Sequence, residues 1–159
     1  WSITQALAHE GPSYIRVGGL SPAPRGQSVK GYLTERRVGG EGAFVASGPL
    51  LTLAALDAAE ILEKESGLEV SVYTTPEICS DPESYALEIL STTDHLIVLE
   101  NHIPSLAKYE HLSRAMADRD VPVHRVGLVG VPGNGQPNEV MEFHGFDAQS
   151  LAAQFLAHR

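Results

Sequence analysis

Cysteine and positive charge are both scarce in this sequence. Its single cysteine, Cys79, excludes an internal disulfide framework and fits a reducing, cytoplasmic setting. We expect Cys79 to be a structural thiol rather than a nucleophile. Only 11 Lys and Arg residues stand against 20 Asp and Glu residues, which gives a formal net charge of -9. A field of this sign repels phosphates at a distance, so DNA and RNA are poor partners.

Long apolar runs and catalytic motifs are also missing. No stretch is long enough to cross a bilayer, so we expect no membrane partner. The 7 histidines lack a metal-ligand spacing, and Ser47 lacks the Gly-x-Ser-x-Gly frame of a serine nucleophile. The loop at 130–135 follows a predicted strand, but Pro132 removes an amide donor and no complete dinucleotide fingerprint is present. We therefore expect no catalytic, cofactor-binding or metal-binding residue.

The length and composition predict one domain with an attached segment. The chain has 159 residues, of which 43% are hydrophobic and 19% are charged. Its beginning reads as a helix over residues 2–9 and a short strand over residues 13–17. Residues 21–28 contain two prolines and no hydrophobic periodicity, which is typical of an interdomain linker. Because the first residue is Trp1 rather than methionine, we expect that the chain begins inside a longer gene product or has been processed.

Strands and helices alternate after the linker. Residues 30–37 and 43–46 are predicted strands, and the glycine-rich segment 39–42 between them favours a hairpin. An amphipathic helix is predicted over residues 50–65, with Gly67 as its C-terminal stop. The remaining predicted elements are strands at 68–73, 95–99 and 121–126, and helices at 82–90, 105–119, 138–143 and 148–157.

This alternation defines the expected fold class. Helices between successive strands imply parallel pairing with right-handed crossovers. We therefore predict an α/β fold, a three-layer α/β/α sandwich with a mostly parallel five-stranded sheet and one antiparallel edge strand.

Three polar residues, Glu100, Asn101 and His102, directly follow the apolar strand and form what we call the strand-end cluster. The carboxyl ends of parallel strands are where ligands and partners collect. Glu100 could accept hydrogen bonds from backbone amides, Asn101 could turn the chain, and His102 could present an imidazole to a partner. Alternatively, all three satisfy the backbone at a strand-to-helix turn.

Several collinear segments resemble the C-terminal region of transketolases and of the beta subunits of 2-oxo acid dehydrogenases. Residues 12–18 look like the closing strand of the family's pyrimidine-binding domain. Residues 45–62 look like the first buried strand, glycine and alanine-rich helix of the C-terminal domain. The sequence Glu-Asn-His at 100–102 is similar to the end of the third strand in transketolases, and residues 145–148 resemble the terminal segment. The glycine cluster that relatives place shortly after Glu-Asn-His is replaced by residues 106–109.

The resemblance implies a division of labour. Residues 1–28 would be the end of the preceding pyrimidine-binding domain plus a linker, and residues 29–159 a transketolase C-terminal-like domain. Thiamine diphosphate and a divalent metal would be bound by the upstream domains of the parent enzyme, and none by this chain. Arg16 would correspond to a substrate-phosphate-binding arginine, since a guanidinium suits a phosphate.

We therefore expect a fragment or split subunit of a transketolase-like enzyme that transfers a two-carbon ketol unit. Its own role would be assembly and dimer packing with the upstream domains or subunit, and the isolated chain would be inactive. One alternative is the partner-docking domain of a 2-oxo acid dehydrogenase beta subunit. Another is an independent α/β domain that binds a small metabolite at the strand-end cluster and the loop at 130–135.

Overall fold

The computed structural model describes residues 2–16, 31–76, 82–102 and 108–159. The strands are β1 (Thr34–Arg37), β2 (Ala43–Ser47), β3 (Ser71–Thr75), β4 (Leu96–Glu100) and β5 (Val123–Gly127). The helices are α1 (Ser2–Ala8), α2 (Pro49–Ser66), α3 (Ser84–Leu90), α4 (Lys108–Met116), α5 (Pro137–Phe143) and α6 (Ala148–Ala157), with a 3-10 turn at Ala117–Arg119 after α4.

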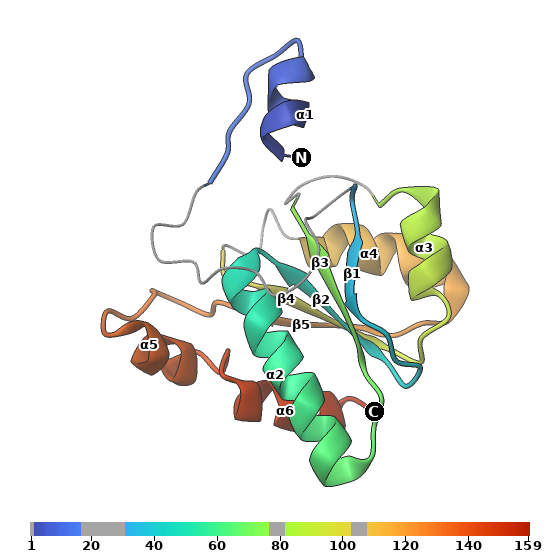
Figure 1. Ribbon diagram of the computed structural model, residues 1–159, viewed down its shortest axis with the longest axis vertical. Helices are drawn as coiled ribbons and strands as arrows, with labels where there is room; N and C mark the ends of the chain where they lie inside the picture. The colour runs from blue at the N-terminus through green and yellow to red at the C-terminus, as the bar shows by residue number, and fades with distance from the viewer. Residues whose placement is uncertain (1, 17–30, 77–81, 103–107) are drawn as a thin grey trace.

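One sheet organises these elements (Figure 1). Its five strands lie in the order β1-β3-β2-β4-β5. β2 is parallel to β3 and β4, and β4 is parallel to β5, whereas β1 is antiparallel to β3. The predicted fold class is confirmed, because the sheet is mostly parallel with one antiparallel edge strand and is flanked by helices.

The predicted hairpin between the first two strands is wrong. β1 pairs with β3 instead, so β3 lies between β1 and β2. The glycine segment crosses the beginning of β3: Gly39 N–H donates to Ser71 Oγ at 2.8 Å, and Gly40 N–H donates to the Glu69 carbonyl at 2.9 Å. A Cβ atom on Gly39 would overlap the Glu69 carbonyl. Glycine is therefore needed here for close backbone approach rather than for a hairpin turn.

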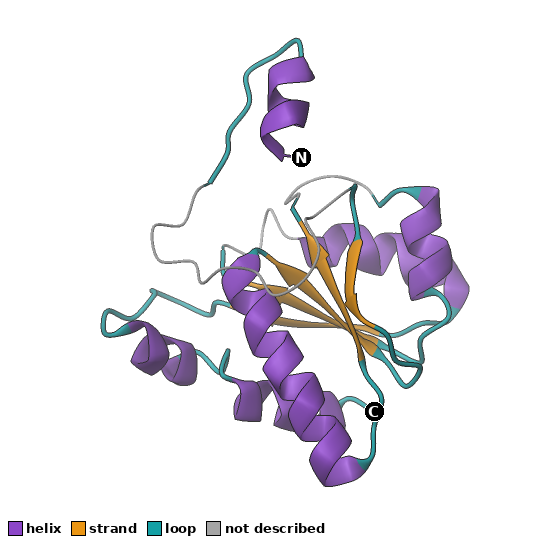
Figure 2. Cartoon of the chain, viewed as in Figure 1, coloured by secondary structure: helices purple, strands orange, loops and turns teal. Residues whose placement is uncertain are grey.

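Helices lie on both faces of the sheet (Figure 2). Successive residues of the central strands face opposite sides of the sheet, which creates two cores. In β2, Phe44 and Ala46 pack with α2 and α6, whereas Ala43 and Val45 pack with α3 and α4. All five residues of β2, β3 and β4 are buried. Near-continuous apolar strands covered on both faces are typical of parallel sheets, and they explain the three layers.

The two helices on one face have clear sequence signals. Pro49 is the first residue of α2, where its missing N–H costs nothing. Gly67 ends α2 with a φ of 68°, in the left-handed region that favours glycine. Asp147 caps α6 by accepting a hydrogen bond from Ser150 N–H at 2.9 Å. α6 coincides with its predicted range, and α2 extends the predicted range by one residue at each end.

The N-terminal segment contains one helix, α1, that is not packed into the hydrophobic core. α1 has no buried residue, and Leu7 and Tyr14 are 83% and 86% exposed. The strand predicted at 13–17 is wrong over residues 13–16, which form no ladder with any described strand. An unpaired extended segment leaves its backbone groups to water. The predicted linker at 21–28 and Cys79 lie outside the described residues.

No helix within the described ranges combines the length and hydrophobicity needed to cross a membrane.

Candidate functional site at the carboxyl end of the sheet

Glu100 is the last residue of β4 and is completely buried. Its Oε1 accepts a hydrogen bond from the backbone N–H of Tyr109 in α4 at 3.3 Å. Its Oε2 accepts one from Arg125 Nε in β5 at 3.2 Å. A buried carboxylate needs such partners, because its desolvation is otherwise very costly. Glu100 therefore connects β4 to β5 and to the beginning of α4, and the backbone hydrogen bond expected from the sequence is present.

Arg125 reaches Glu100 because Gly127 has no side chain. The sheet register places Gly127, rather than Arg125, opposite Glu100. A Cβ atom on Gly127 would overlap the Arg125 guanidinium. Sequence reasoning missed Arg125, although a charged residue inside a mostly apolar strand was a usable signal.

His102 lies on the other side of the Glu100 carboxylate. Its Nε2 is 3.6 Å from Glu100 Oε1, which is an ion-pair distance if the imidazole is protonated. Burial is the largest effect and lowers the His102 pKa; Glu100 opposes this, and the charges of Arg125, Arg16 and Lys108 lower the pKa further. At neutral pH the imidazole is therefore uncharged, and we treat its contact with Glu100 as polar rather than ionic.

Lys108 is a second residue that sequence reasoning did not single out. It is the first residue of α4, it is completely buried, and its Nζ lies 4.1 Å from the centre of the Tyr32 ring. A cation over an aromatic face is attracted by the ring quadrupole. Lys108 lies in the segment 106–109, where the resemblance predicted glycines.

The other two predicted site residues lie at the surface or close to it. Asn101 is half-buried in the bend after β4. Arg16 is exposed, and its charge contributes to the lowered pKa of His102. The structure thus brings Glu100 and His102 into contact and adds Arg125, whereas Arg16 acts on this group through its charge.

The cluster is directed inward. The Nε2 atom of His102 and the Nη2 atom of Arg125 are buried and have no hydrogen-bond partner among the described residues. The hydrogen bonds of Glu100 join β4, β5 and the beginning of α4, and the two unpaired nitrogen atoms lie inside this junction.

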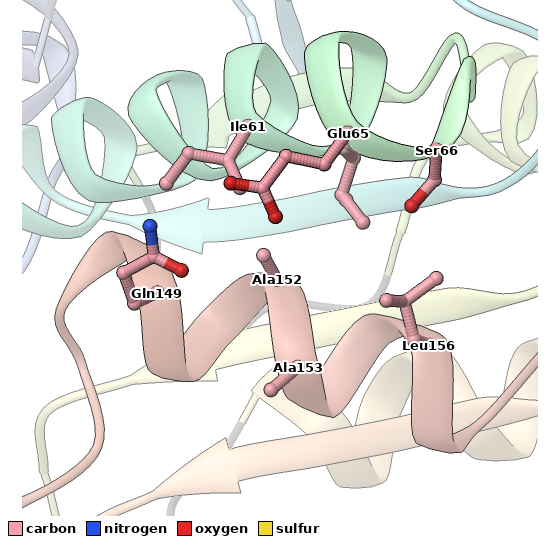
Figure 3. A pocket seen from close by; sticks show the side chains of 8 residues that line it. Ile61, Glu65, Ser66, Gln149, Ala152, Ala153 and Leu156 are labelled. Carbon is pink, nitrogen blue, oxygen red and sulfur yellow. The ribbon is translucent and has the colours of Figure 1, made fainter.

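Two hollows lie elsewhere on the surface. Figure 3 shows one of about 120 Å³ between α2 and α6, where Ile61 and Glu65 face Ala152 and Leu156. The other, of about 320 Å³, is lined by residues from the loop before α5 and from α5 itself: Gly133, Asn134, Glu139, Val140 and Phe143. The first hollow is well below the usual size of ligand pockets, which starts at about 300 Å³, and the second hollow is at the lower limit of that size.

Across the described part of the chain, no group of three or more His, Cys, Asp or Glu side chains is arranged to hold a metal ion.

The comparisons with known proteins agree with this fold. The family model described as "Transketolase, C-terminal domain" matches residues 31–151. This chain belongs to the transketolase C-terminal domain family. A comparison with curated protein sequences found no match.

Solved transketolases share the fold. A split-gene transketolase, described as an inactive beta4 tetramer, is 25% identical with a TM-score of 0.76, and the match covers 95% of this chain and 51% of that one. Transketolase from Campylobacter jejuni is 19% identical with a TM-score of 0.57, and the match covers 86% of this chain and 20% of that one. A Pichia stipitis transketolase mutant is 21% identical with a TM-score of 0.56, covering 77% of this chain and 17% of the other. The chain thus spans about half of the split-gene chain and about a fifth of the Campylobacter enzyme.

Proposed function

We propose that this chain is the C-terminal module of a transketolase-like, thiamine-diphosphate-dependent enzyme that transfers a two-carbon ketol unit. The observation that carries this proposal is the family match over residues 31–151, together with the 95% coverage of this chain by a split-gene transketolase. Residues 1–28 would belong to the end of the preceding domain and a linker, and residues 29–159 would form the module. The single cysteine supports a cytoplasmic setting.

The described residues do not fit the cofactor. Thiamine diphosphate with a divalent metal needs oxygen ligands around an open cavity. Glu100 is buried and already bonded to Arg125 and Tyr109, and the larger surface hollow offers one carboxylate, Glu139. We propose that the upstream domains or subunit of the enzyme hold the cofactor, and that this module supports their assembly.

Assembly needs apolar surface, and two segments supply it. In the N-terminal segment, Leu7 and Tyr14 are nearly fully exposed. In the segment 129–143, Val129, Val131 and Phe143 are 86%, 89% and 76% exposed. Several large exposed apolar side chains within a short segment are typical of a protein contact. We propose that both segments contact the upstream polypeptide or a second protomer of a homodimer, with the strand-end cluster supporting this side of the module from within.

Arg16 is the residue of this chain that we propose for substrate binding. It is exposed, and a guanidinium binds phosphate through paired N–H donors. Arg16 would act together with the upstream domains, because it lies in the segment that leads to them. Its replacement by Gln in the reconstituted enzyme should raise KM for a ketose phosphate more than it lowers kcat.

Reconstitution tests the proposal. The purified chain is mixed with the upstream polypeptide, thiamine diphosphate and magnesium, and ketol transfer between sugar phosphates is measured. We expect a stable complex and activity that neither part shows alone. Turnover by the isolated chain, or the lack of any complex, would contradict the proposal. Calorimetry of the isolated chain with phosphorylated sugars gives a second test, because an assembly module should bind them negligibly.

A further inference from the structure

Three histidines gather at the opposite end of the sheet from Glu100. His95 directly precedes β4, His124 is in β5, and His158 directly follows α6. The rings of His124 and His158 are stacked with centres 4.0 Å apart, and the rings of His95 and His124 meet edge-on at 6.4 Å. We call these three residues the histidine cluster.

The histidine cluster runs from solvent into the core. His158 is exposed, His124 is half-buried, and His95 is only 3% exposed. The His95 ring packs on Phe155 of α6 with centres 4.4 Å apart. Glycine at position 42 leaves room for this contact. A Cβ atom there would lie 2.7 Å from Phe155 and 2.8 Å from His95, which is too close for either ring to stay in place. The last turn of α6 thus contacts the sheet through these imidazole rings and through Phe155, whose ring also packs on Phe44 of β2 with centres 5.3 Å apart.

Burial and neighbouring cationic groups disfavour protonation of His95 and His124. Burial is the main cause of the lowered pKa of His95; Asp94 opposes this effect, whereas His124, His158 and Arg159 add to it. The pKa of His124 is also lowered, first by burial and then by His158.

Two further observations indicate that a proton on His95 would find no nearby partner. The nearby carboxylate of Glu41 is engaged by Arg159 at 3.2 Å and by the backbone N–H of Glu69 at 2.9 Å. His95 Nε2 is buried and has no hydrogen-bond partner among the described residues, so a proton placed there would find no acceptor.

We propose that the histidine cluster makes the attachment of the C-terminal end of α6 to the sheet sensitive to acid. At neutral pH the uncharged rings stack and hold Phe155 against the sheet. As pH falls, a charge on His124 is disfavoured by burial and by the stacked His158, and a charge on His95 is buried without a partner. The last turn of α6 then leaves the sheet, while the central strands stay paired.

The direction of the effect follows from linkage. His95 and His124 have folded-state pKa values below the ordinary value of 6.5, so the folded state binds fewer protons than the free segment does. Their contribution to the attachment is therefore complete above pH 6.5 and is lost as pH falls through the lowered values. The loss therefore begins below pH 6.5, the ordinary histidine value.

Hydrogen exchange on the full chain tests the proposal. Amide protection is compared at about pH 7.5 and about pH 5.5, on either side of the ordinary histidine pKa, after correction for intrinsic rates. We expect protection at residues 154–158 to fall by about tenfold or more, while β2 and β4 change by less than about twofold. An equal loss in α6 and the central strands, or no loss, would overturn the proposal.

Variants separate the histidine cluster from general acid effects. His158→Gln removes the outer ring at an exposed position, so the variant should fold and should lose much of the pH response. His9→Gln is the matched control, since His9 is exposed on the N-terminal segment. The proposal is wrong if His158→Gln responds to pH as the unmodified chain does, or if nuclear magnetic resonance titration finds His95 and His124 protonating at or above pH 6.5.

Discussion

Arg125 in β5 reaches the Glu100 carboxylate at the end of β4 across the bare backbone of Gly127. Replacing Arg125 by Met removes the charged partner of a completely buried carboxylate. We expect the free energy of unfolding to fall by about 3 kcal/mol, because the uncompensated charge remains in the core. Urea unfolding followed by circular dichroism measures this loss.

Gly127→Ala should also lower the free energy of unfolding, by about 1–3 kcal/mol, because the added Cβ atom displaces the Arg125 guanidinium.

A double variant distinguishes charge from packing at this site. Glu100→Gln combined with Arg125→Met removes both charges and should lose less stability than Arg125→Met alone. If the double variant is as unstable as the sum of the two single variants, the ion pair is not the source of the effect.

Gly39 and Gly40 are neighbours with opposite expectations. A Cβ atom on Gly39 would overlap the Glu69 carbonyl, whereas one on Gly40 would meet nothing within 4 Å. Gly39→Ala should lower the free energy of unfolding by about 1–3 kcal/mol, since backbone atoms must shift. Gly40→Ala should be neutral or stabilising by up to about 1 kcal/mol, because it restricts the unfolded chain. Chemical unfolding of the two variants checks this, and equal effects would contradict the described crossing.

Asp147 holds the beginning of α6. Burial, the largest single effect, raises its pKa, but hydrogen bonds from Ser150 and neighbouring backbone N–H groups together lower the pKa below its usual value. Asp147→Ala should cost about 1 kcal/mol and lower the melting temperature by roughly 2–4 °C.

Two further measurements test the role of Asp147 as the N-cap of α6. Asp147→Asn should restore most of the stability, since Asn is also a good N-cap. Because the folded-state pKa is lowered, the contribution of the charged cap is present above its ordinary value of 3.8 and lost as pH falls through the folded value. A thermal unfolding series from neutral to acidic pH would show whether Asp147→Ala removes that part of the pH dependence.

Val131 and Val38 provide a matched pair for the proposed contact. They are 89% and 70% exposed, but Val38 lies between β1 and β2, outside the segment 129–143. Val131→Asp should weaken binding of the upstream polypeptide by at least about tenfold, because a charge is costly in an apolar contact. Val38→Asp should leave the dissociation constant unchanged. Calorimetric titration measures both, and a similar loss in the two variants would assign the effect to net charge.

The helices of one layer were predictable because their signals are local. Pro49 and Gly67 mark the two ends of α2, and Asp147 marks the beginning of α6. The order of the strands in the sheet could not be predicted from such local signals. The glycine segment 39–42 is compatible with a hairpin, and only contacts between distant residues, such as the pairing of β1 with β3 and the packing of Gly39 on the Glu69 carbonyl, show that the chain crosses β3 instead. Turn composition constrains the backbone conformation but does not identify the partner strand.

The candidate site was predicted only in part, because local signals identify some of its residues and not others. Glu100 and His102 stood out because they directly follow an apolar strand. Arg125 and Lys108 did not, because the contact of Arg125 with Glu100 depends on the register between β4 and β5, and the contact of Lys108 with Tyr32 joins residues far apart in sequence. Contacts between residues distant in sequence are set by the fold as a whole, which periodicity alone does not resolve.

The two outer strands constrain how copies of this module associate. β1 carries Glu35, Arg36 and Arg37 with an irregularity between Glu35 and Arg37, and β5 carries His124 and Arg125. Charged side chains and bulges on outer strands discourage backbone pairing with another molecule. A continuous intersubunit sheet, and the fibrillar growth that it would permit, are therefore disfavoured. Oligomers of this module should join through helices and loops, with each sheet ending inside its own subunit.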